Sequence, residues 1–144
     1  MKIRLFMLGK TRRPEIRALL DDYLKRIGHH ADVDAVELRD ASAALKKLDA
    51  DRSAHVVLLD AAGKLCSSEE FAAWLGKLRD SGERRLIFLC GDAEGFPESL
   101  RVRARMKLSL GPLTLSHELT RVVLAEQLYR AFAILSGRDR KSVV

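Results

Sequence analysis

Residues 55–90 read HVVLLDAAGKLCSSEEFAAWLGKLRDSGERRLIFLC, and this stretch decides the fold class. It begins with an apolar, β-branched run over residues 55–60, which is typical of a buried strand. Ser67 and Glu70 then form a capping-box pair at the start of an amphipathic helix. A second apolar run, over residues 86–90, closes the stretch. A strand, a helix and a strand in this order predict an α/β fold with a mostly parallel sheet flanked by helices.

The same alternation continues towards both ends of the chain. A further apolar run, over residues 3–8, predicts a first strand. Residues 33–38 are predicted as a half-buried strand and residues 107–110 as the fifth strand. Helical patterns occupy residues 14–27, 41–48 and 97–104, with Pro14 suited to a first helical turn and Gly28 to a C-cap. At this length we expect one domain over residues 1–144, which ends in a polar, basic tail at 137–144. That tail is either a frayed end or an arm that becomes ordered on RNA.

The predicted helix His117–Leu135 differs from an ordinary surface helix, because it carries two apolar stripes. One stripe consists of Leu124, Leu128, Ala131 and Leu135, and the stripe beside it of Val122, Ala125, Tyr129 and Phe132. A surface helix needs only one such stripe to pack on a sheet. The second stripe predicts either the equivalent helix of a second copy, in a symmetric homodimer, or a helix sunk deeper in its own chain.

The charge and cysteine content narrow the function classes. With 26 Lys and Arg against 20 Asp and Glu, the net charge is +6, which favours an anionic partner, nucleic acid first. No apolar run approaches the roughly 20 residues that a membrane-spanning helix needs, and the apolar start is too short for a signal peptide. Cys66 and Cys90 are too few for a disulfide framework or a four-ligand zinc site. We therefore expect a reduced, cytoplasmic protein that holds no metal.

Three glycine-bearing loops follow predicted strands, at residues 59–64, 90–95 and 110–115. The carboxyl ends of parallel strands meet at one edge of a sheet, so together these loops predict a ligand pocket. The sequence lacks a G-x-G-x-x-G fingerprint, a P-loop, an H-E-x-x-H motif and a G-x-S-x-G elbow. Dinucleotide binding, P-loop chemistry, metal catalysis and hydrolysis by a serine nucleophile are therefore poor interpretations.

Residues 113–131, LTLSHELTRVVLAEQLYRA, closely resemble the end of the ribosomal RNA large subunit methyltransferase H family. Leu58-Leu59-Asp60 followed by Gly63-Lys64, the segment Leu8-Gly9-Lys10 and residues 23–27 resemble the same family. This family belongs to the SPOUT class of methyltransferases. The resemblance implies a homodimer with a trefoil knot near the C-terminus, which sequence rules alone would not predict because threaded chains are rare.

The resemblance also implies a reaction and a cofactor. Members methylate N3 of a pseudouridine in 23S rRNA of the large ribosomal subunit, with S-adenosylmethionine as the methyl donor. By position, the cofactor contacts of the family fall on residues of the three loops, namely Leu59, Gly91, Leu110, Gly111, Pro112, Leu113, Thr114 and Leu115. Because this donor is already activated, the protein mainly positions and desolvates the reactants.

Two residues of the last helix are candidate catalytic groups. Arg121 is placed to stabilise the anion that forms when the pseudouridine N3 proton leaves, or to hold a phosphate. His117, one turn earlier, is the weaker candidate for removing that proton. For both residues the alternative is a purely structural role at the start of the helix.

Contacts to RNA are expected from arginines in exposed segments: Arg12, Arg13, Arg138 and Arg140. Relatives commonly end in a Pro-Tyr-His stretch, where this chain has Arg138 to Lys141, so its tail offers charge but no stacking ring. Two other functions stay open: a SPOUT enzyme with another target such as tRNA, and a ribosome-binding module without catalytic activity.

Overall fold

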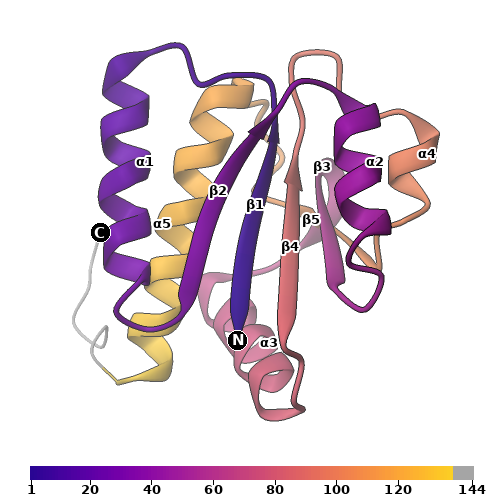
Figure 1. The fold of residues 1–144 in the computed structure, drawn as a ribbon. Coiled ribbons are helices and arrows are strands. Elements are labelled where there is room, and N and C mark those ends of the chain that lie inside the picture. Colours follow the sequence, from indigo (N-terminus) through magenta and orange to yellow (C-terminus); the bar gives the residue numbers. More distant parts are fainter. Residues whose placement is uncertain (138–144) are drawn as a thin grey trace.

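The computed structural model describes residues 1–137 and contains one parallel sheet (Figure 1). Its strands are β1 (Lys2–Leu8), β2 (Asp32–Leu38), β3 (His55–Leu65), β4 (Arg85–Cys90) and β5 (Met106–Ser109). They lie in the order β2-β1-β4-β3-β5, and every neighbouring pair is parallel. The predicted α/β fold with a mostly parallel sheet is confirmed.

Helices cover both faces of this sheet (Figure 1). Their bounds are α1 (Pro14–Ile27), α2 (Ala41–Asp49), α3 (Ser68–Asp80), α4 (Glu98–Arg101) and α5 (His117–Leu135). One face carries α1, α3 and α5 over a core that includes Leu5, Phe88 and Leu128. The other face carries α2 and α4 over a smaller core around Phe6 and Leu58. Alternate residues of β1 and β3 thus enter opposite cores, as a sheet buried on both faces requires.

Local sequence signals explain most element boundaries. Ser67 and Glu70 form the predicted capping box at the start of α3, with both reciprocal hydrogen bonds present. Gly82, just beyond the end of α3, has φ +86°, the left-handed conformation that terminates many helices. Gly28 caps α1 differently, in a right-handed conformation with φ −57°. The helix predicted over residues 97–104 is shorter, since α4 ends at Arg101.

Strand β3 is longer than the apolar run that predicts it, and a close approach explains the difference. Its pairing with β5 shifts between Leu59 and Lys64, so the residues between them bulge away before the strand rejoins β5. A Cβ atom on Gly63 would lie 2.6 Å from the carbonyl carbon of Lys107. Only glycine therefore lets the returning strand lie this close to β5.

The second apolar stripe of α5 is partly covered by the chain's own helices. The rings of Tyr129 and Tyr23 of α1 have their centroids 6.2 Å apart, and Phe132 stacks on His30 at 5.5 Å. On the other side, Leu135 packs against Gly76 of α3. Contacts within the monomer thus cover part of this stripe, while Val122 and Tyr129 stay partly exposed. The homodimer and the C-terminal knot stay predictions.

Two expected absences can be compared with the described residues. No helix within residues 1–137 is long and apolar enough to cross a membrane. The same part of the chain contains no group of three or more His, Cys, Asp or Glu side chains placed to hold a metal ion. The tail arginines, Arg138 and Arg140, lie outside the described residues.

Candidate ligand-binding site

The three glycine-bearing loops meet at the carboxyl edge of the sheet and line one cavity of about 670 Å³. This volume lies within the roughly 300–1,000 Å³ of small-molecule sites. The segment 59–64, predicted as a loop, is the bulged part of β3 and contributes Leu59 and Asp60. The loop after β4 contributes Gly91 and Asp92, and the loop after β5 contributes residues 110–115 except 112. The sequence therefore predicted the position of the cavity, because parallel strands bring their carboxyl ends together.

Most of the residues expected to contact a cofactor line this cavity. They are Leu59, Gly91, Leu110, Gly111, Leu113, Thr114 and Leu115. Pro112 belongs to the same loop but is not among the lining residues. His117 lines the cavity from the first turn of α5, whereas Arg121 does not.

The lining combines apolar side chains with exposed backbone. Leu108, Leu110 and Phe96 supply apolar surface, as a nucleoside base requires. Gly111 has φ +141°, a conformation that L side chains rarely adopt. A Cβ on Gly91 would lie 3.1 Å from the ring of Phe96, so any larger residue there must push this ring. At both glycines the missing side chain lets a ligand approach the backbone closely, although the N–H and the carbonyl of Gly111 are already hydrogen-bonded to the Ser109 hydroxyl.

The sequence analysis did not predict a charged pair of side chains in the cavity wall. Arg101 of α4 donates from Nη2 to Asp60 Oδ2 at 2.5 Å, and both residues line the cavity. The backbone N–H of Ala62, and after it the Arg101 guanidinium, lower the pKa of Asp60. Asp60 ends the apolar run of β3, which is a recognisable signal, but no local pattern connects it with a residue 41 positions later.

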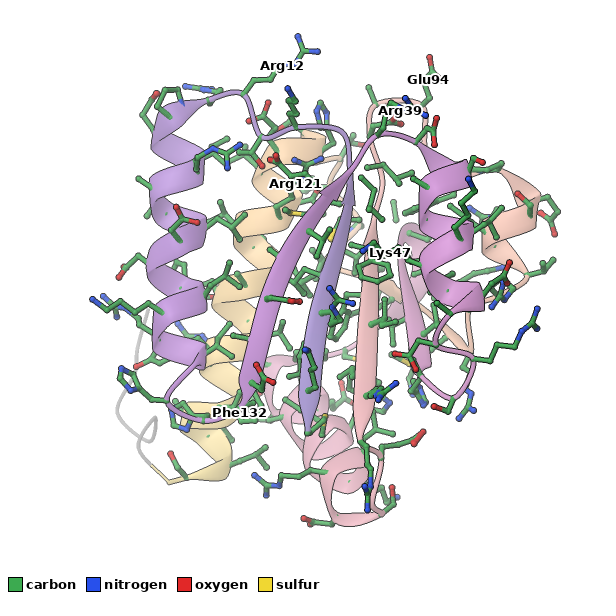
Figure 2. The ribbon with its side chains drawn as sticks, viewed as in Figure 1. Arg12, Arg39, Lys47, Glu94, Arg121 and Phe132 are labelled. Atoms are coloured by element: carbon green, nitrogen blue, oxygen red, sulfur yellow. The ribbon has the colours of Figure 1, made fainter. Side chains whose placement is uncertain are left out.

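Arg121 lies on the other side of α5, where its guanidinium is fully buried (Figure 2). It donates to Thr11 Oγ1 at 2.8 Å, to the Leu8 carbonyl at 2.7 Å and to the Gly9 carbonyl at 3.1 Å. Burial lowers the pKa of Arg121, but an arginine remains a cation at neutral pH. In this geometry Arg121 holds the loop after β1 and does not face the cavity, which departs from the role expected of it.

Glu118, beside Arg121 in the first turn of α5, holds the same loop. Its Oε1 accepts hydrogen bonds from the backbone N–H groups of Arg12 and Arg13, each at 3.1 Å. The Arg13 N–H is the main cause of the lowered pKa of Glu118. The side chains of Arg12 and Arg13 remain exposed, and Figure 2 shows Arg12 projecting outward from the carboxyl edge. Both are therefore accessible to a large polyanion.

Cys90 precedes the cavity glycine Gly91 but belongs to the core. It is fully buried and packs in the cluster beneath α5. Burial raises the pKa of its thiol to about 12, so the group is neutral at physiological pH and no nucleophile. Cys90 therefore takes no part in the cavity lining.

Comparisons with known proteins agree with this geometry. A family model described as predicted SPOUT methyltransferase matches residues 1–139. The chain is 43% identical, over 95% of each chain, to the ribosomal RNA large subunit methyltransferase H of Koribacter versatilis. It is 37% identical to the protein of that name from Listeria monocytogenes, over 95% of this chain and 97% of the relative.

Solved structures share the fold at low sequence identity. A probable methylase family protein from Haemophilus influenzae superposes with a TM-score of 0.62 at 11% identity, covering 97% of this chain and 70% of that one. The SpoU methyltransferase AviRb from Streptomyces viridochromogenes, in complex with its cofactor AdoMet, gives 0.56 at 12% identity, covering 88% and 56%. On the family model and the curated relatives, this chain belongs to the SPOUT methyltransferases and, among them, to the ribosomal RNA large subunit methyltransferase H family.

Proposed function

We propose that this protein is an S-adenosylmethionine-dependent methyltransferase that modifies N3 of a pseudouridine in 23S rRNA of the large ribosomal subunit. The observation that carries the proposal is the cavity in which the bulge of β3 and the loops after β4 and β5 meet. The names of the relatives supply the substrate class, large-subunit ribosomal RNA.

The residues present fit this cofactor. The cavity volume suits a nucleoside with an amino-acid side arm, and its leucines and Phe96 offer an apolar surface to the adenine. Backbone at Gly91 and Gly111 can approach the ligand closely because neither residue carries a Cβ. When bound, S-adenosylmethionine supplies a methyl group activated by its sulfonium. We assign cofactor binding to Leu59, Gly91, Gly111 and the rest of the 110–115 loop.

The protein's own part in the reaction is to exclude water, to position the reactants and to accept a proton. The apolar lining desolvates the reacting atoms. His117 lines the cavity at the start of α5, so we assign to its imidazole the acceptance of the N3 proton of the base. Arg121 becomes a positioning residue, because its hydrogen bonds fix the loop that carries Arg12 and Arg13.

RNA binding is assigned to the exposed arginines at the carboxyl edge. Arg12 and Arg13 are fixed through their backbone by Glu118, while their side chains are exposed. Arg13 also lies 4.0 Å from Glu15 in an exposed ion pair, which a phosphate can replace. Arg138 and Arg140 remain candidates for the same role from the tail. We further propose that the protein works as a homodimer in the cytoplasm, where ribosomes are found.

The proposed function is tested by mapping methylated nucleotides. Ribosomes lacking the modification are incubated with the protein and isotope-labelled S-adenosylmethionine, and the RNA is digested and analysed by mass spectrometry. We expect label on one pseudouridine of 23S rRNA. Label in tRNA would identify another SPOUT activity, and cofactor-independent ribosome binding without label would identify a non-catalytic module; either outcome overturns the proposal. Calorimetric titration with S-adenosylmethionine provides the binding control.

A further inference from the structure

Negatively charged side chains outnumber fixed positive ones in the wall of the cavity. Among the described residues that line it, Arg101 alone carries a fixed positive charge, while Asp60 and Asp92 are carboxylates. His117 is the other basic group of the lining. A ligand that brings a carboxylate into this cavity therefore meets repulsion at Asp60 and Asp92 and attraction at Arg101.

The guanidinium of Arg101 is held in place at the wall. Its Nη2 bonds to Asp60 Oδ2, and Asp60 in turn accepts the Ala62 backbone N–H at 3.0 Å. The side chains of Arg101 and Asp60 are 31% and 17% exposed, so both are partly withdrawn from water but still reachable. Such a pair loses little further side-chain freedom when a ligand binds.

Arg101 has donors to spare. A guanidinium has five N–H donors in a planar fork, and Asp60 is the side-chain partner that the described part of the chain gives it. The unused edge matches the geometry of a carboxylate, which arginine binds with two parallel hydrogen bonds. A lysine at this place would offer a point charge but no such fork.

From this geometry we infer that Arg101 is a specificity-determining residue, whose guanidinium binds the α-carboxylate of the methionyl part of S-adenosylmethionine while Asp60 acts as its positioning residue. The inference rests on the proposed function, since it requires this cofactor in this cavity. It also fixes the direction of the ligand. The methionyl end lies towards α4 and the bulge of β3, and the adenine towards the apolar 110–115 loop.

The test pairs a change in the protein with a change in the ligand. Calorimetry measures the binding of S-adenosylmethionine and of its decarboxylated analogue to the wild-type protein and to Arg101→Gln. The wild type is expected to prefer the carboxylate-bearing ligand by about tenfold, which is typical of a charge-assisted hydrogen bond at a partly exposed site. Arg101→Gln is expected to bind S-adenosylmethionine about tenfold more weakly and the analogue unchanged, so the preference disappears.

Arg103→Gln is the matched control. Arg103 follows α4 two residues later, pairs with Asp49 at 2.7 Å and does not line the cavity. The Arg103→Gln change removes the same charge as Arg101→Gln. This variant should keep the tenfold preference for S-adenosylmethionine over its decarboxylated analogue. Arg101→Lys, which retains the charge, should keep part of that preference and serves if Arg101→Gln fails to fold.

The outcomes separate the inference from the proposed function. If Arg101→Gln and Arg101→Lys keep the full wild-type preference, or if Arg101→Gln weakens both ligands equally, Arg101 is structural and the inference is wrong. If the wild type binds S-adenosylmethionine without any preference over the analogue, the inference is wrong and the proposed function stands. If the wild type binds neither ligand, the proposed function itself is overturned.

Discussion

The first turn of α5 separates two regions that are built in opposite ways. On one side, His117 and Thr120 line an open cavity with apolar side chains and bare glycine backbone. On the other side, Glu118 and Arg121 satisfy the backbone groups of the loop after β1. The loop contact uses both Nη atoms of the Arg121 guanidinium, whereas in the cavity wall the Arg101 guanidinium has Asp60 as its side-chain partner among the described residues and keeps further N–H donors for a ligand. The comparison shows that neighbouring polar residues of one motif can serve binding on one face and architecture on the other.

The largest effect is expected from Arg121→Ala. This change leaves the buried Leu8 carbonyl, the partly buried Gly9 carbonyl and the Thr11 hydroxyl without this donor, and it opens a cavity beside the core. We expect the free energy of unfolding to fall by about 3 kcal/mol, measured by urea denaturation. Arg17→Ala is the matched control, because Arg17 donates to the Thr11 carbonyl and to Glu37 from a half-exposed position.

The control variant Arg17→Ala should lower the free energy of unfolding by less than about 1 kcal/mol. Unchanged stability of Arg121→Ala together with lost methylation would show that the comparison is wrong and that Arg121 acts at the reacting atoms.

A smaller loss of stability, together with weaker cofactor binding, is expected from Gly111→Ala in the cavity wall. Gly111 and Gly82 both have positive φ, and an added Cβ would meet no atom within 4 Å at either position. Each alanine variant should therefore lose about 1 kcal/mol of stability through backbone strain. Only Gly111→Ala should also weaken S-adenosylmethionine binding, by about tenfold, because only Gly111 lines the cavity. Equal cofactor affinity in the two variants would remove Gly111 from the binding site.

A weaker effect is expected from the double variant Arg12→Gln, Arg13→Gln. Loss of two phosphate contacts should lower the affinity for rRNA about fivefold at moderate salt and reduce the slope of log K against log salt by about 2. Stability should be unchanged, since the loop is held through its backbone. The control, Lys77→Gln with Arg79→Gln at the end of α3, removes the same charge. Similar losses in both variants would mean that net charge, and not this loop, binds RNA.

The smallest expected effect is a loss of thermal stability in the variant Glu118→Gln, and this loss depends on pH. The backbone N–H of Arg13 is the main cause that lowers the pKa of Glu118 below its ordinary value of 4.5. A lowered folded-state pKa means that the carboxylate stabilises the fold above pH 4.5 and that this contribution is lost as the pH falls through the folded pKa. Glu118→Gln should therefore unfold at a lower temperature than the wild type at pH 7, with the gap closing in acid. A constant gap across that range would contradict the assigned contact.

The sequence was most informative where structure depends on local pattern. Helix α5 begins at His117 and ends at Leu135 as its apolar spacing predicts, and the capping box at Ser67 forms as expected. The position of the cavity followed from topology, since two of the glycine-bearing segments come after strands of one parallel sheet and the third is the bulge of β3 beside them. These features need only periodicity, capping and the geometry of the sheet.

The sequence was least informative where residues far apart in the chain meet. The return of β3 to β5 depends on the missing side chain of Gly63, whose neighbour Lys107 lies 44 positions further on. Arg121 carries a charge that suggests exposure, yet the loop after β1 buries it completely. The Asp60–Arg101 pair also joins two separate segments. Local sequence patterns do not predict such long-range contacts, because the same residues would suit a solvated surface equally well.

The most direct test of the account is a crystal structure of the protein grown with S-adenosylhomocysteine, the product form of the proposed donor. We predict density for the nucleoside between Gly91 and Gly111, with the amino-acid end near Arg101. A ligand seated elsewhere, or a hollow closed by the protein's own side chains with no room for adenosine, would contradict the central claim.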